Sequence, residues 1–541
     1  MRQTPNAKRE KVNIVGGNSF GRYPKISLAS TYNMYISDGW LVNTAGYERA
    51  ANLLADGVGR GIFLSTRGNF LIAVVNSQVL RIDTPLNITV IGTLTTTVGE
   101  VFIDENLNQQ IAIVDGVNIY IYNWSLFPNL TVQTPVGGLT PNYIEYHNTF
   151  FLVGNSNQQA ANGSAWYVFQ YTAATTIGVV PNGGGVFAIQ TKPDNALAVI
   201  RLPGQSNNVF VMGTTVSEIW VQVGGLQNYR RNSTYNIDYG CASISTIARS
   251  DTFVAWLAIN ERNSPVIMTF DGREAKPISG FGIDHILSHI KYPAQSTAML
   301  YKLSGHLLYQ LTFYNPADNY TFLYDFNTQM FFWLTDHNLN FHPAREYVLF
   351  NGTSYFISLT NGALYETSTE LTTYNENLKS IYPPNPLINY EIPRVRVCDT
   401  LYSDDSAQFR PNSFVMTIEQ GQDTNYYDIV GDNPIHTEID SPLSDVPIYT
   451  EGGLPIYLEG QFPGYELDFG QIPFKPRVDL SISIDGAQSF GNPVSRVLNP
   501  VAHRQNILNW EKMGACNSWT PMLRFWNMSR FVAYNGMVDV A

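Results

Sequence analysis

A two-strand unit recurs along residues 60–370 and constrains the fold more than any other feature of this sequence. Each unit combines a continuous apolar run, a short polar or glycine-containing turn, and a second run in which apolar and polar residues alternate. The apolar runs are LIAVVN (71–76), IAIVDG (111–116), FFLVGN (150–155), VFVMGT (209–214), FVAWLA (253–258), LLYQLT (307–312) and SYFISL (354–359). Their starts lie 39 to 59 residues apart, which is enough chain for four short strands and their loops.

This spacing predicts an all-β fold whose main part is a β-propeller with six or seven blades. A continuous apolar run suits the second strand of a blade, because the neighbouring blades bury both of its faces. The third repeat is rich in loop residues at 158–165, which leaves the blade number open. The alternative is one or two large β-sandwiches, but sandwich strands come every 8–12 residues or so without a higher period.

The first and last repeats differ in a way that predicts how the ring closes. The first has four candidate strands between residues 61 and 92, whereas the last has only three between 347 and 367. We expect the missing outer strand to come from the N-terminal segment, within WLVNTAGYERA (40–50). Such a strand would remove the two open sheet edges.

A second region is expected after residue 371. The proline-rich segment at 382–393 is unsuited to a central strand and is interpreted as a linker. Strand-like runs follow it, which predicts a β-sandwich-like C-terminal domain. The expected organisation is an N-terminal segment (1–59) that partly closes the ring, a propeller (60–370), and a C-terminal β-domain (371–541) with an acidic insertion at 422–474.

Composition limits the classes of function. Charged residues make up only 14% of the chain, against about 25% in ordinary domains, and the formal net charge is −12. A negative surface does not attract phosphates over long range, so tight electrostatic binding of nucleic acid is not expected. Three widely spaced cysteines predict neither a disulfide framework nor a zinc site. The first residues lack the apolar stretch of a signal peptide, and no apolar run approaches the ~20 residues of a membrane span.

The acidic residues gather in one segment. Residues 399–468 hold 14 acidic side chains and a single basic one, Arg410. The segment also contains an octapeptide repeat, PIYTEGGL and PIYLEGQF (447–462), which favours an extended arm or hairpin. It is interpreted as a solvated loop, a docking arm or a rim that repels DNA. The interaction or channel candidates are Asp423, Asp428, Asp432, Glu438, Asp440, Asp445, Glu451 and Glu459.

The sequence predicts no catalytic, cofactor-binding or metal-binding residues. His285 and His289 have one-face helical spacing, but the pair lacks the glutamate of an HExxH motif and an evident third ligand. His337 and His342 follow Asp336 without a G-x-S-x-G elbow nearby. The segment 483–490 partly matches the Asp-box of sialidases, but an Asp-Gly pair between strands predicts a turn.

Several segments, in order along the chain, resemble the packaged-DNA stabilisation or tail nozzle proteins of short-tailed bacteriophages (podoviruses). They include NMYISDG (33–39), TTVSEIWVQVGG (214–225), GCASISTIAR (240–249) and DGREAKPISGFGIDHIL (271–287). The most specific block is NWEKMGACNSWTPMLRFWNMSRFVAYNGMVDV (509–540). The chain departs from the family pattern at Ala487 and Phe490, where a glycine and a tryptophan are usual, and the acidic segment 422–474 resembles an insertion.

The resemblance implies a propeller with an added β-domain, assembled as a homohexameric ring in the virion tail. Such a ring would continue the DNA channel below the portal and adaptor, retain packaged double-stranded DNA, allow its ejection, and carry tail spikes or fibres and a plug or needle. It would assemble in the host bacterial cytoplasm, need no cofactor and catalyse nothing. The residues leave two alternatives open: a sialidase-like propeller glycosidase, and a receptor- or carbohydrate-binding propeller.

Overall fold

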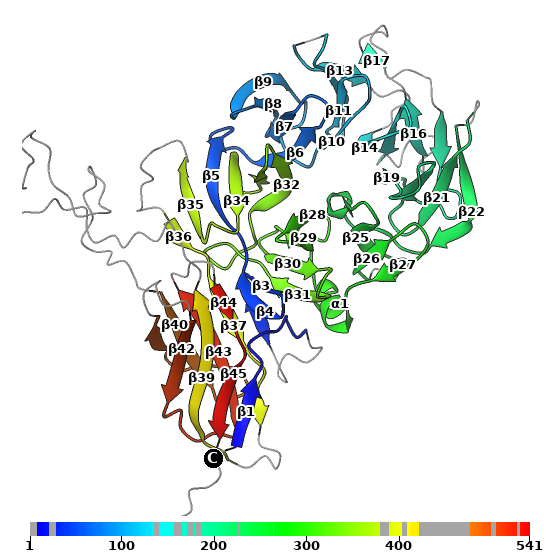
Figure 1. Cartoon of the computed structure of the whole chain (residues 1–541). Coiled ribbons are helices and arrows are strands. Elements are labelled where there is room, and N and C mark those ends of the chain that lie inside the picture. Colours follow the sequence, from blue (N-terminus) through cyan, green and yellow to red (C-terminus); the bar gives the residue numbers. More distant parts are fainter. Residues whose placement is uncertain are drawn as a thin grey trace, which may run out of the picture.

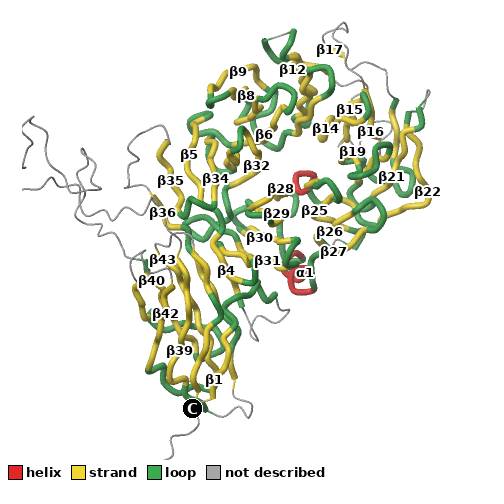
Figure 2. The backbone as a smooth tube through the Cα atoms, viewed as in Figure 1, coloured by secondary structure: helices red, strands yellow, loops and turns green. Residues whose placement is uncertain are grey.

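The computed structural model is almost entirely β-sheet (Figures 1 and 2). The residues that it describes are 8–20, 29–126, 128–134, 140–155, 165–169, 178–179, 185–224, 228–262, 264–378, 389–402, 408–420, 476–498, 505–526 and 531–540. All eight acidic candidates between Asp423 and Glu459 lie outside these residues, as does the octapeptide repeat.

Seven small sheets follow one another along the chain and form a ring (Figure 1). The first contains β6 (Gly59–Ser65), β7 (Phe70–Val75), β8 (Gln78–Asp83) and β9 (Asn87–Thr93). The second contains β10 (Phe102–Glu105), β11 (Gln110–Val114), β12 (Ile119–Asn123) and β13 (Thr131–Thr134), with β17 (Gly178–Val179) beside β13. The third contains β14 (Pro141–His147), β15 (Phe150–Asn155), β16 (Ala165–Phe169) and β18 (Val186–Ala188). The fourth contains β19 (Ala198–Arg201), β20 (Asn208–Met212), β21 (Ser217–Gln222) and β22 (Tyr229–Ile237).

The remaining sheets complete the circuit. The fifth and sixth contain β23 (Gly240–Cys241), β24 (Ala248–Arg249), β25 (Val254–Ile259), β26 (Val266–Phe270) and β27 (Ala275–Pro277); and β28 (Ser296–Leu303), β29 (His306–Phe313), β30 (Tyr320–Asp325) and β31 (Met330–Trp333). The seventh begins with β32 (Ala344–Phe350), β33 (Thr353–Ser358) and β34 (Ala363–Ser368). The described helices are α1 (Phe281–Leu287) and the short 3₁₀ turn η2 (Ile244–Thr246). Because β32 contacts β6, the last sheet meets the first and closes the propeller.

The predicted β-propeller is confirmed, and its blades arise from the strand pattern seen in the sequence. The apolar runs at 71–76 and 111–116 lie in β7 and β11, each the second strand of its blade and buried along its whole length. By contrast, the first four residues of the outer strand β9 are exposed. The burial gradient from the inner strands to the outer edge follows the apolar content of each strand.

The seventh blade takes its fourth strand from the N-terminal segment. β5 (Gly46–Asn52) pairs antiparallel with β34, so residues more than 310 positions apart in the chain lie side by side. Residues 46–50 of the expected segment 40–50 therefore lie in β5, whereas residues 40–43 form a separate strand described below. The same sheet continues through β35 (Thr373–Leu378), parallel to β5, and β36 (Asn389–Glu391), so it includes residues on both sides of position 371.

A β-sandwich lies beside the propeller and includes strands from both ends of the described chain (Figure 1). One sheet has the order β1 (Lys8–Val12), β45 (Gly536–Val540), β39 (Pro411–Gln420), β44 (Phe531–Ala533), β4 (Trp40–Asn43) and β3 (Met34–Ser37), with β42 (Gln505–Glu511) paired to β39. The other has β2 (Ser30–Tyr32), β37 (Arg394–Val397), β43 (Ser518–Trp526), β40 (Arg477–Ser483) and β41 (Val494–Val497), with β38 (Leu401–Tyr402) paired to β43.

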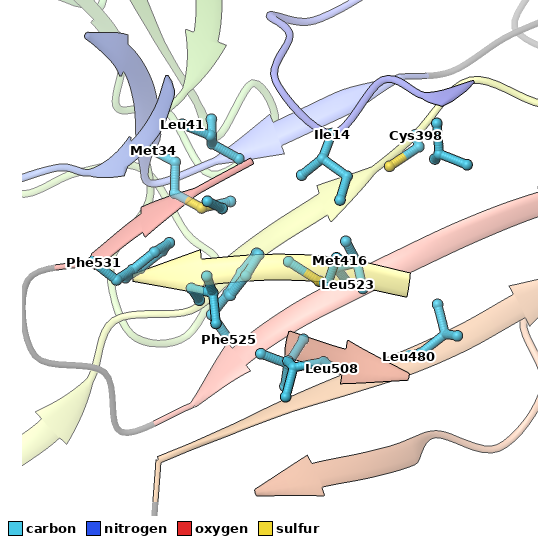
Figure 3. Close-up of a cluster of buried hydrophobic side chains, with 14 of the residues drawn as sticks. Ile14, Met34, Leu41, Cys398, Met416, Leu480, Leu508, Leu523, Phe525 and Phe531 are labelled. Carbon is cyan, nitrogen blue, oxygen red and sulfur yellow. The ribbon is translucent and has the colours of Figure 1, made fainter. Parts of the chain in front are cut away.

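Apolar side chains from both sheets fill the space between them. Figure 3 shows Met416 and Phe531 of the first sheet beside Leu480, Leu523 and Phe525 of the second. The strands β37, β39, β40 and β43 lie within the region where strand-like runs are expected after the linker, and residues 531–540 form two further strands, β44 and β45. The sandwich also contains β1, β3 and β4, because their apolar residues, such as Met34 and Leu41, complete this core.

Candidate functional site

The inner strands of the propeller place charged side chains around its axis. Each blade begins with the strand closest to the axis, and β6, β10 and β14 contact one another in sequence along the ring. Polar residues at these positions contact neighbouring blades, and Arg201 and Arg249 also reach solvent. Eight charged residues on or next to the first strands of the blades are called the axial cluster below: Arg60, Glu100, Asp104, Glu145, Arg201, Arg249, Arg345 and Glu346.

Glu145 holds the largest ion-pair network of the axial cluster. This residue of β14 is almost fully buried, and its Oε1 lies 2.6 Å from Nε of Arg201 on β19. Arg249 of β24 contacts the same oxygen, so one carboxylate joins the inner strands of three consecutive blades. Arg201 also lies 3.8 Å from Asp104 of β10. Burial raises the pKa of Asp104, and the positive charge of Arg201 opposes that rise.

A second network joins the seventh blade to the first two. Arg345 of β32 lies 3.0 Å from Glu100, the residue two positions before β10. The neighbouring Glu346 accepts a hydrogen bond of 3.2 Å from the backbone N–H of Ile62 on β6. Desolvation raises the pKa of Glu346 to about 7, and the Ile62 N–H and the charge of Arg345 act in the opposite direction. These contacts span the seam where the ring closes.

Arg60 completes the axial cluster without a direct carboxylate partner among the described residues. Its guanidinium donates hydrogen bonds of 2.7 to 2.9 Å to the backbone carbonyls of Gly99, Asn76, Thr96 and Val98. These carbonyls belong to the first blade and to the loop between the first and second blades, so the arginine fastens that loop to β6. Backbone carbonyls satisfy a buried cation because each one directs a partial negative charge at an N–H.

The axial cluster is balanced: it contains four carboxylates and four guanidinium groups, and most of its carboxylates contact an arginine or a backbone N–H. Glycoside hydrolysis requires two carboxyl groups that face a substrate, whereas these carboxylates link strands. Within the described ranges, no group of three or more His, Cys, Asp or Glu side chains is arranged to hold a metal ion. The contacts of the cluster hold the inner strands of neighbouring blades together.

The histidines singled out in the sequence occupy different environments. His285 lies in α1, and its backbone carbonyl receives a hydrogen bond of 2.7 Å from Nδ1 of His289. The ring of His337 stacks on Tyr390, with centroids 4.4 Å apart. His342 is buried between β31 and β32, and burial lowers its pKa to about 3.

The segment 483–490 forms a tight turn after β40. Asp485 accepts hydrogen bonds of 2.6 Å from Ser483 Oγ and 3.0 Å from the backbone N–H groups of Gln488 and Ser489. These bonds hold the pKa of the Asp485 carboxyl well below its usual range, with the Ser483 hydroxyl as the largest cause. Each acceptor oxygen of the side chain is engaged within the turn itself.

The structure also shows polar contacts that sequence reasoning missed, at the junction between the sixth blade and the sandwich. Arg396 of β37, almost fully buried, donates to the backbone carbonyls of Gly17 and Asn13 at 3.0 and 3.1 Å. Nearby, His306 at the start of β29 lies between Ser37 at the end of β3 and Asp325 at the end of β30. These residues are far apart in the sequence and carry no shared motif, so no local signal identifies them.

Comparison with known proteins identifies the family. A family model described as bacteriophage P22 Gp10, beta-propeller, matches residues 20–366. This range begins before β2 and ends within β34, so it covers nearly all of the seven blades described above. The chain belongs to this phage stabilisation family. Membership makes it a phage structural protein associated with the virion, in agreement with the resemblance seen in the sequence.

Several solved structures show a low level of similarity to this chain. The WD40 propeller domain of Doa1 is 11% identical, with a TM-score of 0.37 over 60% of this chain and 97% of that chain. A virginiamycin B lyase from Staphylococcus aureus is 12% identical, with a TM-score of 0.38 over 59% of this chain and 97% of that chain. The N-terminal domain of Nup159 is 8% identical, with a TM-score of 0.36 over 60% and 94%. These identities and TM-scores are too low to indicate a function for this chain.

No curated protein matches the sequence. Among the described residues, no helix has the length and apolar character needed to cross a membrane.

Proposed function

We propose that this phage structural protein is a subunit of the tail nozzle of a short-tailed phage, where copies form a ring that continues the DNA channel below the portal and adaptor. In this role the ring retains packaged DNA and allows its passage into the host. It also carries tail spikes or fibres and a plug or needle. Six copies form the ring in this proposal, which assembles in the host bacterial cytoplasm before joining the virion.

The observation that carries the proposal is the family match over residues 20–366, which includes nearly all of the propeller. Two structural features support it. The positive and negative charges of the axial cluster offset one another through ion pairs. This arrangement suits a subunit that must stay rigid while neighbouring subunits exert force on it. Several large apolar side chains are exposed, among them Phe281 at 94%, Val98 at 79% and Ile507 at 70%, which suits contacts with other subunits.

The charge of the chain supports the passage of DNA without binding to it. Double-stranded DNA carries about one negative charge per 1.7 Å, and each phosphate neutralised by a protein cation strengthens adhesion. With a formal net charge of −12, the subunit repels DNA over long range. We place the acidic residues from Asp423 to Glu459 at the lumen or at a docking surface, and their position in an assembled ring tests that placement.

The test is the assembly state of the full-length chain. Native mass spectrometry across a concentration series, followed by electron microscopy, is expected to show rings of six times the 60.5 kDa chain mass, alone or on portal–adaptor complexes. A chain that stays monomeric and fails to join portal–adaptor complexes contradicts the proposal. Incubation with sialylated and neutral glycans in the same preparation distinguishes the two alternatives, since glycan cleavage indicates a glycosidase and binding without ring assembly indicates a receptor-binding propeller.

A further inference from the structure

Three side chains from separate strands meet in line at the junction between propeller and sandwich. The hydroxyl oxygen of Ser37 lies 3.0 Å from Nε2 of His306, and Nδ1 of His306 lies 2.9 Å from Oδ2 of Asp325. Serine hydrolases use this order of contacts, with the carboxylate on one ring nitrogen and the hydroxyl on the other. Ser37 is half-buried, His306 is 8% exposed and Asp325 is fully buried.

The surroundings of Asp325 determine the orientation of the histidine. Oδ1 of Asp325 accepts a hydrogen bond of 2.9 Å from the backbone N–H of Asn327, and Oδ2 accepts one of 2.8 Å from the Thr328 hydroxyl. Because the carboxylate accepts from each partner, His306 donates through Nδ1, and in the neutral ring Nε2 is then the acceptor for the proton of Ser37. The ring of Tyr35 packs edge-on against His306, with centroids 5.2 Å apart, and fixes the plane of the imidazole.

Ser37 is the last residue of β3 and precedes a tight hairpin turn whose residues are exposed. Asp38 and Gly39, with φ of 51° and 80°, form the turn between β3 and β4, and positive φ at both positions is typical of a type I′ turn. In the described part of the chain, no acceptor contacts the backbone N–H of either residue. Free N–H groups in the two residues that follow Ser37 are of the kind that can stabilise an oxyanion.

An exposed aromatic surface adjoins the hydroxyl. Trp40 lies directly opposite Ser37 in the β3–β4 register, so the two side chains project from the same face of the hairpin. Trp40 is 40% exposed, and its ring lies 4.2 Å from that of Tyr534. This surface suits an aryl or short acyl group better than a long or charged substrate.

We propose that Ser37, His306 and Asp325 form a serine hydrolase site for carboxylic esters with small acyl or aryl groups. Ser37 Oγ attacks the ester carbonyl while Nε2 of His306 takes the hydroxyl proton. The carbonyl–oxygen bond then breaks, and His306 returns the proton to the departing alcohol. Water attacks the resulting acyl-serine in the same way, which releases the carboxylic acid and restores Ser37. Ser37 and His306 are the catalytic residues, and Asp325 is the positioning residue.

A channel wall needs no chemistry, so this inference goes beyond the proposed function and does not depend on it. The competing explanation is that the three residues only clamp the β3–β4 hairpin to the sixth blade. A clamp and a hydrolase share the same hydrogen bonds but differ in the reactivity of the Ser37 hydroxyl. Reactivity is therefore the property to measure.

The full-length protein is incubated with a fluorophosphonate probe, which modifies activated serines, and the site is mapped by peptide mass spectrometry. Modification of Ser37 in the folded chain, and its absence after heat denaturation, is the expected result. Folded protein in which Ser37 stays unmodified, or in which many serines react equally, overturns the proposal.

Variants distinguish catalysis from clamping. Ser37→Ala is expected to abolish both probe modification and hydrolysis of p-nitrophenyl acetate. The matched control is Ser288→Ala, because Ser288 lies 3.2 Å from Nδ1 of His289 in an exposed pair, and both activities should persist.

Asp325→Asn is expected to lower kcat by roughly 10³-fold or more while KM stays within about twofold, since the wrong histidine tautomer affects proton transfer and not binding. Equal activity in Ser37→Ala and unmodified protein rules out the site, and mapping on the unmodified chain remains decisive even where a variant fails to fold.

Discussion

Tyr32 of β2 lies in parallel register with Trp333 of β31, and their rings stack with centroids 6.3 Å apart. Through this pair the outer strand of the sixth blade continues into the sandwich, so that β28 and β41 belong to one ten-stranded sheet. The propeller and the sandwich are therefore joined by backbone hydrogen bonds as well as by side-chain packing. We expect the two parts to unfold together, because neither retains a complete sheet without the other.

Asn33 is the first test of this junction. Its side chain is fully buried, donates to Thr335 Oγ1 at 2.8 Å and to the Pro393 carbonyl at 2.7 Å, and accepts from the Thr335 N–H at 2.8 Å. Asn33→Gly preserves the positive φ of 56° but leaves buried partners unsatisfied, so we expect the free energy of unfolding to fall by about 2–4 kcal/mol. Urea denaturation measures the loss. Asn69→Gly, at an exposed position with φ of 53°, is the control and should change stability by less than about 0.5 kcal/mol. Equal effects of the two substitutions would contradict the role of Asn33.

Gly46 tests the closure of the ring. A Cβ at this position would lie 2.6 Å from the carbonyl oxygens of Leu371 and Thr373, which are backbone atoms with little freedom to move. Gly46→Ala is therefore expected to displace the start of β5. We expect the free energy of unfolding, measured by thermal denaturation, to fall by about 2–4 kcal/mol. Gly352→Ala provides the matched control, since its Cβ meets nothing within 4 Å and only the positive φ of 84° opposes it; a cost of about 1 kcal/mol is expected there. A Gly46→Ala chain as stable as the control would show that the closure tolerates displacement.

Glu145 tests the axial cluster. In Glu145→Gln the guanidinium groups of Arg201 and Arg249 lose the buried carboxylate that faces both of them. Breaking one partner of a buried ion pair costs about 3–5 kcal/mol, but water reaches both arginines, so we expect a loss of about 2 kcal/mol in chemical denaturation. Glu274→Gln removes an exposed pair with Lys276 and should change stability by less than about 0.5 kcal/mol. The cluster is unimportant for stability if the two variants behave alike.

His342 makes the fold sensitive to acid. Burial lowers its pKa to about 3, whereas the unfolded chain takes up the proton near pH 6.5. The unfolded state thus binds more protons between these two values, and stability falls by up to about 1.4 kcal/mol per pH unit as the pH drops below about 6.5. His342→Gln removes this contribution, so its stability difference from the unmodified chain should shrink by about 1.4 kcal/mol between pH 7.5 and pH 5.5. Denaturant titrations at both pH values provide the measurement, with His289→Gln as an exposed control. A difference that does not change with pH would show that His342 takes up its proton in the folded chain.

The propeller was predictable because its signal is local and repeated. In β7 and β11 every residue is buried, and the sequence shows this as runs such as LIAVV and IAIV, which need no knowledge of the partner strand. The missing strand of the last blade was also predictable from the count of candidate strands. The position of β1, β3 and β4 in the sandwich was not, because a short strand shows which of its faces is apolar but not which sheet will cover that face.

By itself, the sequence determined the type and order of the strands in the ring, because alternating and continuous apolar patterns depend on neighbouring residues only. It also determined the family to which the chain belongs, through segments that occur in order along the chain. The tertiary structure decided which charges meet at the axis and which polar groups meet at the junction. Glu145 and Arg249 lie on different blades, and Ser37 and His306 are separated by 269 positions. Contacts of this kind depend on the register and rotation of whole sheets, which are set by the summed packing of the core, and no local pattern of residues encodes them.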